Sequence, residues 1–416
     1  AMSRRWSFLT KATQRGSPLP SICAGNSVHN ASAAPLNLIV EGWRFLPHSY
    51  AIVNQWHLLG LLTRDVRLKV RDAPFHRPWQ TQAGLFDPQA ECALQALEIA
   101  EEGAKSDVTL RIFAPFTFAP SASPLTAVFA TLEQQVIRRH QMAAGDEYER
   151  LRRQPPPPEV RAVTPSRWSA AGFYRAGFQT GQVRIVPHGV DTATFRPVPD
   201  IRPHARESVG LRDDHFVFLS VGAMTANKGM DLLLRAFAQT ARSCPSARLV
   251  LKGLDPLYRS KARLQQWVNL LSTADQHALT DKVIYRGEVM SHREMAKLYQ
   301  AADVYVSPYR AEGFNLPVLE AAACGLPIIC TRGGPTDDFV NDEFARRIES
   351  KVAVTAVEGQ DACHLDPNLD HLIALMTSAL TETIWRRHAA EAGPHHVRAS
   401  YTWDHIVAQL LSALMH

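Results

Sequence analysis

The chain has 416 residues and is 46% hydrophobic, which is enough to bury two cores of roughly 150 to 200 residues each. It carries no run near the roughly 18 to 20 consecutive apolar residues of a membrane helix, and its basic N-terminus lacks the apolar stretch of a signal peptide, so we expect a cytoplasmic protein. Its 45 basic and 40 acidic residues are too evenly balanced to indicate a nucleic-acid partner.

The cysteines form no C-x-x-C pair, so the sequence predicts reduced thiols and neither a disulfide framework nor a metal site. They are Cys23, Cys92, Cys244, Cys324, Cys330 and Cys363.

The N-terminal part of the chain alternates apolar strands with amphipathic stretches after an irregular start. Residues 1–35 are rich in Ser, Ala, Gly and Pro, and we expect a mobile arm there. The pattern then predicts strands at 37–40, 66–70, 108–113, 126–131, 160–164 and 184–190, an amphipathic stretch at 50–62 and a helix at 88–100. Because the last strand exits into a turn, we place a boundary near residues 191–203 and an N-terminal domain at 36–195.

The second half of the chain repeats this alternation more clearly. Its predicted strands are 216–221, 248–252, 283–286, 304–307 and 327–330, and its predicted helices are 230–242, 292–302 and 316–324. Strict alternation predicts the α/β class, with two Rossmann-like, doubly wound parallel-sheet domains that face a cleft, the second at residues 196–395. Ligands of such domains bind beyond the carboxyl ends of the strands.

A glycine-to-lysine loop follows the strand at 216–221 and leads into the next helix. Gly222 lets the backbone approach a phosphate, the helix directs amides at the anion, and Lys228 adds a charge. Thr225 and Asn227 lie within the same loop. Taken alone, a glycine-to-lysine loop of this kind is more often a solvated lysine in an ordinary turn, and a second loop further along the chain changes that balance.

A second loop carries two glutamates between a strand and a short helix. Glu312 precedes the helix at 316–324, and Glu320 lies about one turn inside it. The glycine-rich entry supplies free amides for a diphosphate, and a carboxylate such as Glu320 can accept two ribose hydroxyls at once. The structural alternatives are a loop carboxylate for Glu312 and a favourable charge near the helix N-terminus for Glu320.

Together these segments resemble the group 1 (family 4) glycosyltransferases of the GT-B fold. The resemblance covers most of residues 160–331 and rests on EGFNLPVLEAAACGLPII, NKGMDLLLRAF, VIYRGEV, LYQAADVYVSP, PSRW and RIVPHGVDTATFRP. The segment YTWDHIVAQLLSAL is similar to the helix that crosses back onto the N-terminal domain in this family, which implies that residues 400–416 join that domain.

The resemblance implies a retaining, metal-independent transfer of a sugar from a nucleotide-diphosphate donor, with no cofactor. Lys228 would bind the diphosphate, Glu320 the ribose and Glu312 the donor sugar, so Lys228 and Glu312 are the expected catalytic residues. The backbone around Gly313, Phe314, Asn315 and Leu316 would hold phosphate or sugar hydroxyls, and Val289 would lie near the base. Helix N-termini and cations replace the divalent ion.

The sequence departs from the family where an arginine usually follows the glycine of the first loop. This chain has Ala223 there, and Lys252 is the candidate replacement cation, against the alternative of a strand-end surface lysine.

The N-terminal domain also departs from the family, since only Gly42 stands where paired glycines are usual. His48 and Ser49 are candidates for contacts with the sugar or acceptor, although an N-cap role is favoured for Ser49. Glu133 stands where a histidine is sometimes found after the fourth strand, and His188 suits a turn or hinge better than catalysis.

Two other functions remain open. Ala223 and the altered first loop fit a degenerate sugar-nucleotide-binding protein that has lost turnover. The basic balance and the aromatics Trp43, Trp56 and Trp79 fit an enzyme weakly attached to the inner face of a membrane, although such aromatics more often belong to a core or an acceptor cleft. The acceptor is a saccharide, a lipid-linked sugar, a small metabolite or a protein side chain, and the expected role is glycan or polysaccharide biosynthesis.

Overall fold

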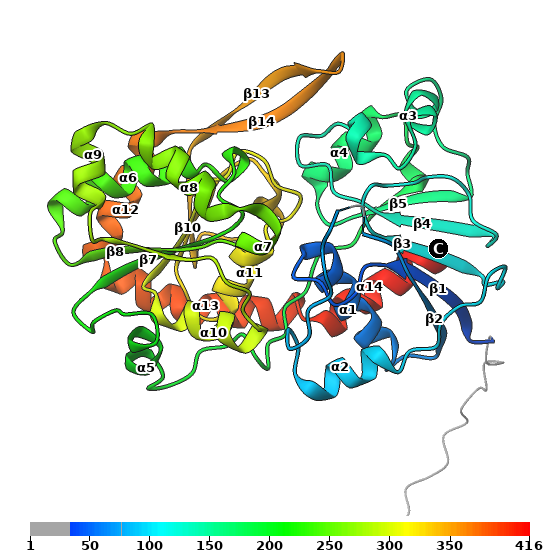
Figure 1. Cartoon of the computed structure of the whole chain (residues 1–416), viewed down its shortest axis with the longest axis horizontal. Coiled ribbons are helices and arrows are strands. Elements are labelled where there is room, and N and C mark those ends of the chain that lie inside the picture. The colour runs from blue at the N-terminus through cyan, green and yellow to red at the C-terminus, as the bar shows by residue number, and fades with distance from the viewer. Residues whose placement is uncertain (1–33, 76) are drawn as a thin grey trace, which may run out of the picture. The chain divides into compact units, whose positions relative to one another are not determined.

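A computed structural model describes residues 34–75 and 77–416 of the chain. Two six-stranded parallel sheets dominate it (Figure 1). The predicted α/β class with two doubly wound sheets is therefore confirmed. Cys23 and nearly all of the predicted arm at 1–35 lie outside the described residues.

The first sheet has the strand order β2-β1-β3-β4-β5-β6. Its strands are β1 (Leu36–Gly42), β2 (Val66–Asp72), β3 (Val108–Ile112), β4 (Leu125–Phe129), β5 (Val160–Thr164) and β6 (Val183–Ile185). The helical segments between them are α1 (Ser49–Leu61), α2 (Pro88–Gln95), η1 (Arg139–Gln141), α3 (Gly145–Leu151), α4 (Arg167–Arg175) and η2 (Thr180–Gln182).

The second sheet has the order β12-β11-β10-β7-β8-β9. Its strands are β7 (Phe216–Val221), β8 (Ala247–Lys252), β9 (Val283–Arg286), β10 (Val304–Ser307), β11 (Ile328–Thr331) and β12 (Ala345–Ile348). Around them lie α5 (Arg202–Glu207), η3 (Ala226–Lys228), α6 (Met230–Ser243), α7 (Asp255–Tyr258), α8 (Ser260–Asn269), α9 (Thr273–Leu279), α10 (His292–Ala301), α11 (Leu316–Ala323), η4 (Pro335–Asp338), α12 (Leu369–Thr381) and α13 (Thr383–Ser400). Successive residues of β7 point to opposite faces of the second sheet, and both faces are buried. Val217 and Leu219 pack in one hydrophobic cluster, and Phe218 packs in a second cluster on the opposite face.

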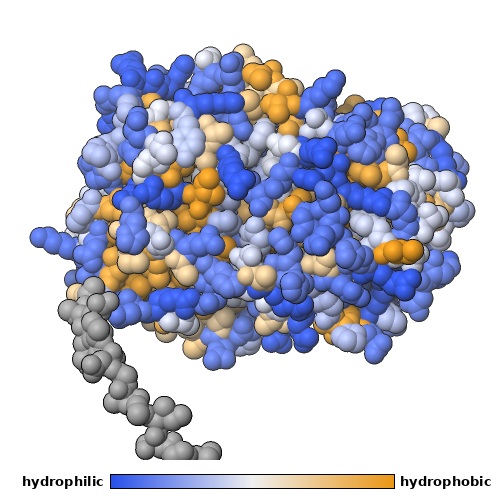
Figure 2. Space-filling view, turned by 180° about the vertical axis from the view of Figure 1, so that it is seen from behind, coloured by the Kyte–Doolittle hydropathy of each residue, from blue (hydrophilic) through white to orange (hydrophobic). Residues whose placement is uncertain are grey.

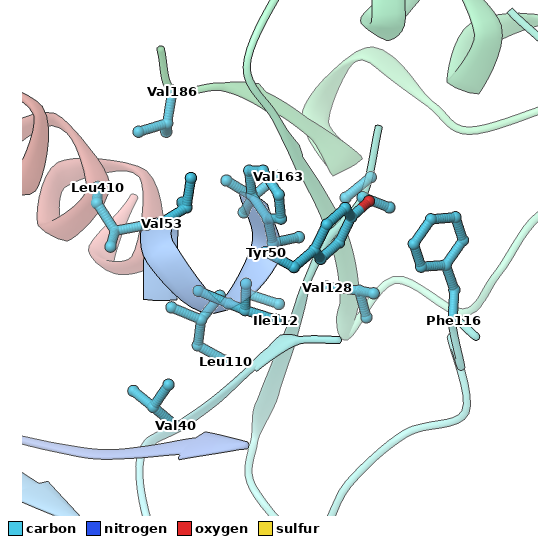
Figure 3. Packing of buried hydrophobic residues seen from close by; sticks show 14 of the residues in the cluster. Val40, Tyr50, Val53, Leu110, Ile112, Phe116, Val128, Val163, Val186 and Leu410 are labelled. Carbon is cyan, nitrogen blue, oxygen red and sulfur yellow. The ribbon is translucent and has the colours of Figure 1, made fainter. Parts of the chain in front are cut away.

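The C-terminal helix α14 (Trp403–Met415) belongs to the core of the first sheet, as the sequence predicts. Its buried residues Ile406, Val407 and Leu410 pack in the same cluster as Val53 of α1 (Figure 3). Gly60 of α1 permits this approach, because a Cβ there would lie 2.5 Å from Val407. Helices from opposite ends of the chain therefore share one core, and Figure 1 draws α14 in red beside the blue α1.

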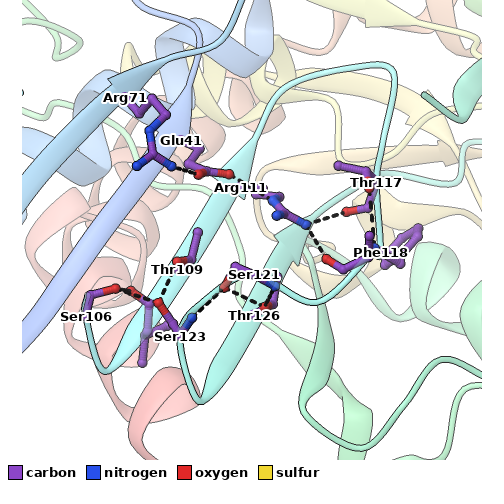
Figure 4. A network of polar contacts seen from close by, with 12 residues as sticks. Glu41, Arg71, Ser106, Thr109, Arg111, Thr117, Phe118, Ser121, Ser123 and Thr126 are labelled. Atoms are coloured by element: carbon purple, nitrogen blue, oxygen red, sulfur yellow. Dashed lines mark hydrogen bonds and ion pairs between the residues drawn. The ribbon is translucent and has the colours of Figure 1, made fainter. Parts of the chain in front are cut away.

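Polar contacts join neighbouring strands of the first sheet to one another and to the loop after β3 (Figure 4). Glu41 of β1 forms ion pairs with Arg71 of β2 and Arg111 of β3, the latter at 2.9 Å. Arg111 also donates to the carbonyl of Ala119 at 2.5 Å and so ties down the loop after β3. These contacts join neighbouring strands and the connection that follows them.

Two predicted elements end five residues earlier than expected, at Gln95 rather than 100 and at Ile185 rather than 190. The helix predicted at 88–100 stops at Gln95, because the backbone at residues 98–100 pairs with Val70 of β2 instead: the Val70 amide donates to Glu98 and the Ala100 amide to Val70. The strand predicted at 184–190 ends at Ile185, and Val190 forms a single bridge with Thr402 near α14.

A two-stranded hairpin formed by β13 (Ser350–Val357) and β14 (Gln360–Pro367) was not predicted. It extends from the second half (Figure 1), and its side chains and backbone contact the first half. The Cys363 amide donates to the Gln134 carbonyl at 2.8 Å, and the Glu358 carboxylate accepts from the Arg139 amide at 2.9 Å and the Tyr148 hydroxyl at 2.7 Å.

On the face shown in Figure 2, hydrophilic residues dominate and the hydrophobic ones form small separate groups. Within residues 34–75 and 77–416, no helix combines the length and the apolar character that crossing a membrane requires.

Candidate functional site

The strand order of the second sheet brings two distant loops together. The chain runs from β7 outward to β8 and β9, then returns to place β10 on the other side of β7. The loops after β7 and β10 therefore leave the sheet at neighbouring carboxyl ends, which is the switch point where doubly wound sheets bind ligands.

The loop after β7 is shaped so that Lys228 lies across Gly222. A Cβ on Gly222 would lie 3.2 Å from Cδ and Cε of the lysine. Thr225 begins the 3₁₀ turn η3, and its carbonyl accepts from the Lys228 amide at 3.1 Å. Gly229 ends the turn in a left-handed conformation with φ of 66°, and a Cβ there would lie 1.9 Å from the Pro308 carbonyl oxygen.

Lys228 and Glu312, which are 84 residues apart, form a close ion pair in which Nζ donates to Oε1. The Glu312 residue is 5% exposed and the Lys228 side chain 21%. Burial of a carboxylate is tolerated here because its charge is paired. The expected diphosphate-binding cation and the expected sugar-side glutamate thus touch directly.

Asn227 links this pair to both halves of the chain. Its main-chain carbonyl accepts from the Arg310 amide at 2.7 Å, which joins the loop after β7 to the loop after β10. Its side-chain amide donates to Glu133 Oε2 at 3.0 Å, and Glu133 follows β4 of the first sheet. The Thr225 hydroxyl donates to the Asn227 side-chain oxygen and holds the amide in that orientation.

Glu133 therefore reaches the site from the first half of the chain. Desolvation by the surrounding protein and the nearby charge of Glu312 raise the pKa of Glu133 to about 7, while Lys228 opposes the shift. The residue is nevertheless exposed to solvent. A carboxylate in this state changes its charge near neutral pH.

The loop before α11 presents main-chain amides beside the ion pair. The Ser166 hydroxyl donates to the Gly313 carbonyl at 2.7 Å, and Asn315 caps the helix in a left-handed conformation while its amide donates to Ser307 Oγ at 2.9 Å. Within the described part of the chain, the amides of Gly313, Phe314 and Leu316 donate to no acceptor. Such amides at a helix N-terminus suit an anion.

Phe314 anchors this loop between the two halves. Its ring, 3% exposed, stacks on Phe339 with centroids 4.6 Å apart and meets His188 edge-on at 4.8 Å. His188 is buried, and burial lowers its pKa well below the usual value. The histidine packs at the connection between the sheets, and its turn or hinge role stays a prediction.

Glu320 lies on α11, and the Tyr299 hydroxyl donates to its Oε2 at 2.7 Å. Burial raises the pKa of Glu320 to about 7, an effect that the Tyr299 hydrogen bond partly offsets. Tyr299 was not among the predicted site residues, although the sequence LYQAADVYVSP contains it. A hydroxyl that orients a carboxylate gives no motif of its own.

Lys252, at the end of β8, is 5% exposed, so the alternative of a surface lysine is wrong. Its ammonium donates to the carbonyl of Gly253 and to that of Glu288 at 2.8 Å, and burial lowers its pKa to about 8. It thereby holds the loop after β9, in which half-buried Val289 follows Glu288. Its role as a second phosphate-binding cation stays a prediction.

The candidates in the first half lie around the end of β1. Gly42 is needed for packing, because a Cβ there would lie 2.6 Å from the Asn54 side chain and 2.9 Å from the Ile112 carbonyl. The N-cap of α1 is His48, whose Nδ1 accepts from the Tyr50 amide at 3.1 Å, so the predicted N-cap role of Ser49 is wrong. Ser49 is instead the first helical residue, and it is exposed.

Two facing Rossmann-like sheets, with a C-terminal helix that returns to the first, define the GT-B class of glycosyltransferase folds. The structure of Anabaena HepE in complex with UDP and glucose has a TM-score of 0.65 at 14% identity over 91% of this chain and 99% of that one. WaaG, a glycosyltransferase involved in lipopolysaccharide biosynthesis, has a TM-score of 0.61 at 16% identity over 91% and 98%. These likenesses establish the fold alone.

Residues 201–391, somewhat less than half of the chain, match the sequence model of the glycosyl transferases group 1. The chain is 30% identical over 232 residues to a GDP-mannose-dependent alpha-(1-6)-phosphatidylinositol monomannoside mannosyltransferase of Mycolicibacterium smegmatis, covering 54% of this chain and 56% of that protein. It is 33% identical over 166 residues to a D-inositol 3-phosphate glycosyltransferase of Acidothermus cellulolyticus, covering 40% and 36%. The chain thus spans about half or less of the length of these curated relatives.

Proposed function

We propose that this chain transfers a sugar from a nucleotide-diphosphate sugar to an acceptor hydroxyl, with retention of anomeric configuration and without a metal or other cofactor. The observation that carries the proposal is the meeting of Lys228, Glu312 and the unpaired amides before α11 at the switch point of the second sheet. A cation and the free amides of a helix N-terminus, placed together, can bind the negative charges of a diphosphate.

Each group has a distinct role in the proposed reaction. Lys228 and the amides of Gly313, Phe314 and Leu316 stabilise the charge that grows on the departing diphosphate. Glu320, oriented by Tyr299, accepts hydrogen bonds from the ribose diol. The departing phosphate takes the acceptor's proton, and the hydroxyl attacks the face that the phosphate leaves.

The competing mechanism is a double displacement through Glu312, in which the carboxylate forms a covalent glycosyl intermediate. A slow fluorosugar donor separates the two mechanisms. It leaves a glycosyl group on Glu312, visible by mass spectrometry of the intact protein, only in the double displacement.

The donor base and the acceptor are first sought among the chemistries that the relatives' names contain. These are GDP-mannose as donor and inositol-bearing acceptors, to which saccharide, other lipid-linked and protein acceptors are added. Acceptors presented in vesicles also test weak membrane association, because a protein that stays behind when vesicles float does not bind them.

The first test is thermal stabilisation by millimolar UDP, GDP, ADP and dTDP in the presence of EDTA. A ligand at about 100 times its dissociation constant stabilises by roughly 2.7 kcal/mol. We expect one nucleotide to stabilise the wild type and a Lys261→Ala control, which alters an exposed lysine of the same half, but not Lys228→Ala. Stabilisation by none of the four contradicts the donor site.

The second test is transfer from the sugar nucleotide whose base binds. A product with the donor's anomeric configuration by NMR supports retention, and an inverted product contradicts it. Nucleotide binding without transfer to any acceptor favours the degenerate sugar-nucleotide-binding protein instead.

A further inference from the structure

Glu133 differs from the other carboxylates of the site in its origin and its pairing. It follows β4 of the first sheet, whereas Glu312 and Glu320 belong to the second half. Glu312 is paired with Lys228, and Glu320 is bonded to Tyr299. Among the described residues, no cation lies within ion-pair distance of Glu133, whose carboxylate is bonded to the neutral amide of Asn227.

The loop that carries Glu133 is held firmly on both sides. The indole of Trp168 donates to the Glu133 main-chain carbonyl at 2.8 Å, and the Leu132 amide donates to Ser169 Oγ at 2.7 Å. The Thr131 amide donates to the Tyr50 hydroxyl at 2.9 Å. The backbone is therefore fixed, and the side chain extends from it to the second half of the chain.

The charges around Glu133 are unbalanced. Two carboxylates, Glu133 and Glu312, share one nearby ammonium, and that of Lys228 is already engaged by Glu312. Arg138 acts on Glu133 more weakly than Lys228 does. Burial raises the pKa of Tyr258 of α7, and the nearby charge of Glu133 adds to this shift, so the phenol stays a neutral neighbour.

The position of Asn227 places Glu133 near the donor. Asn227 directly precedes Lys228, so a group attached to a diphosphate on Lys228 extends into the region between Glu312 and Glu133. A carboxylate there can accept hydrogen bonds from sugar hydroxyls, which are stronger than those to a neutral acceptor. It repels a second carboxylate, because like charges at close range in a partly desolvated site are strongly unfavourable.

Resting on the proposed function, we propose that Glu133 selects the transferred sugar: its carboxylate accepts hydroxyls of a neutral sugar and excludes sugars that carry a carboxylate. Glu133 is then a specificity residue supplied by the first half of the chain to a donor held by the second. The donor binds productively only where the two halves meet at Asn227.

The test compares matched donors with the nucleotide alone by isothermal titration at a pH of about 8.5, where the Glu133 carboxylate is ionised. The probes are UDP, UDP-glucose and UDP-glucuronate, and GDP, GDP-mannose and GDP-mannuronate, on wild type, Glu133→Gln and a Glu102→Gln control. Glu102 is an exposed carboxylate of the same half, so this control makes the same change of charge away from the site. Thermal midpoints show that each variant is folded.

We expect wild type and the Glu102→Gln control to bind the neutral sugar nucleotide about tenfold or more tightly than the uronate of the same base. In Glu133→Gln the uronate gains about tenfold, the neutral sugar loses up to about tenfold, and binding of the bare nucleotide stays within about twofold. The preference for the neutral sugar therefore collapses in this variant alone.

The specificity role is overturned if wild type binds the neutral sugar nucleotide and the uronate equally, or if Glu133→Gln keeps the preference for the neutral sugar. In either case, binding of the bare nucleotide still supports the donor site. Binding of neither UDP nor GDP, together with no stabilisation by ADP or dTDP, overturns the proposed function, and the specificity role with it. The bare nucleotide thus separates the two failures.

Discussion

Replacing Lys228 with methionine removes the ammonium that pairs with Glu312 but keeps an aliphatic chain over Gly222. Glu312, 5% exposed, is then a buried carboxylate without its cation. Breaking a buried pair in this way costs about 3–5 kcal/mol. Because the Lys228 side chain is 21% exposed and water can partly replace it, we expect a smaller loss of about 1–3 kcal/mol.

The assay is the thermal midpoint, measured with and without the nucleotide that binds the wild type. A loss of 1 kcal/mol lowers the midpoint by roughly 2–4 °C in a domain of 150–250 residues, so several degrees are expected. The control is the double variant Lys228→Met with Glu312→Gln, which removes both charges and should recover most of the stability. Neither variant should bind the nucleotide.

Two results would refute this reasoning. If Lys228→Met has the thermal midpoint of the wild type, the ion pair does not stabilise the fold. If it also still binds the nucleotide, Lys228 does not hold the diphosphate. If the double variant is as unstable as the single one, lost packing rather than an unpaired charge explains the change.

Three further perturbations follow from the same geometry. Gly229→Ala places a Cβ 1.9 Å from the Pro308 carbonyl oxygen at a φ of 66°. We therefore expect the free energy of unfolding to fall by at least about 2 kcal/mol and nucleotide binding to be lost. The control Gly181→Ala, whose Cβ meets no atom within 4 Å, should have the thermal midpoint of the wild type. Nucleotide affinity should rise with pH through about 7 and lose this rise in Glu320→Gln, because the ionised carboxylate accepts the ribose hydroxyls. The contribution of Glu320 to stability has the opposite dependence on pH. Between the ordinary pKa of 4.5 and about 7, the Glu320 carboxyl keeps its proton in the folded state but loses it in the unfolded state, so the free energy of unfolding falls as the pH rises. In Glu320→Gln the thermal midpoint should therefore depend less on pH across this range. Glu358→Ala removes the hydrogen bonds to the Arg139 amide and the Tyr148 hydroxyl, so limited proteolysis should cut the hairpin faster than in Asp361→Ala, and equal rates would show that the contacts do not hold it.

The strands and helices around the donor loops could be predicted because local patterns define them. The strands at 216–221, 283–286 and 304–307 have the bounds that the apolar runs predict. The helix predicted at 88–100 fails because Val70 offers backbone partners to residues 98–100, a contact that no local pattern contains. The hairpin did leave a signal, since VAVTAV is rich in β-branched residues and is soon followed by a glycine, and Glu358 and Gly359 take the positive φ of a tight turn in the structure.

The site could be predicted in its parts but not in its contacts. The motifs identify Lys228 and Glu312 separately, while their contact depends on β10 pairing with β7 rather than with β9. For Lys252, the sequence leaves open both a second phosphate-binding cation and a surface lysine, because its carbonyl partners at Gly253 and Glu288 appear only when the loops fold together. Glu133 departs from a family pattern in the sequence, but its contact with Asn227 cannot be predicted locally because the two residues are 94 positions apart.

The pairing of Lys228 with Glu312 also bears on how a donor enters. The ammonium that would hold the diphosphate already neutralises a buried carboxylate, and Ala223 stands where a second cation is usual. A diphosphate must therefore draw the ammonium from Glu312, and binding is favourable only if other groups carry part of the new charge. The unpaired amides before α11 are placed to do so, and a sugar hydroxyl that donates to Glu312 replaces the bond that the carboxylate loses. The bare nucleotide supplies no such hydroxyl, so the complete sugar nucleotide should be the better ligand of this charge arrangement.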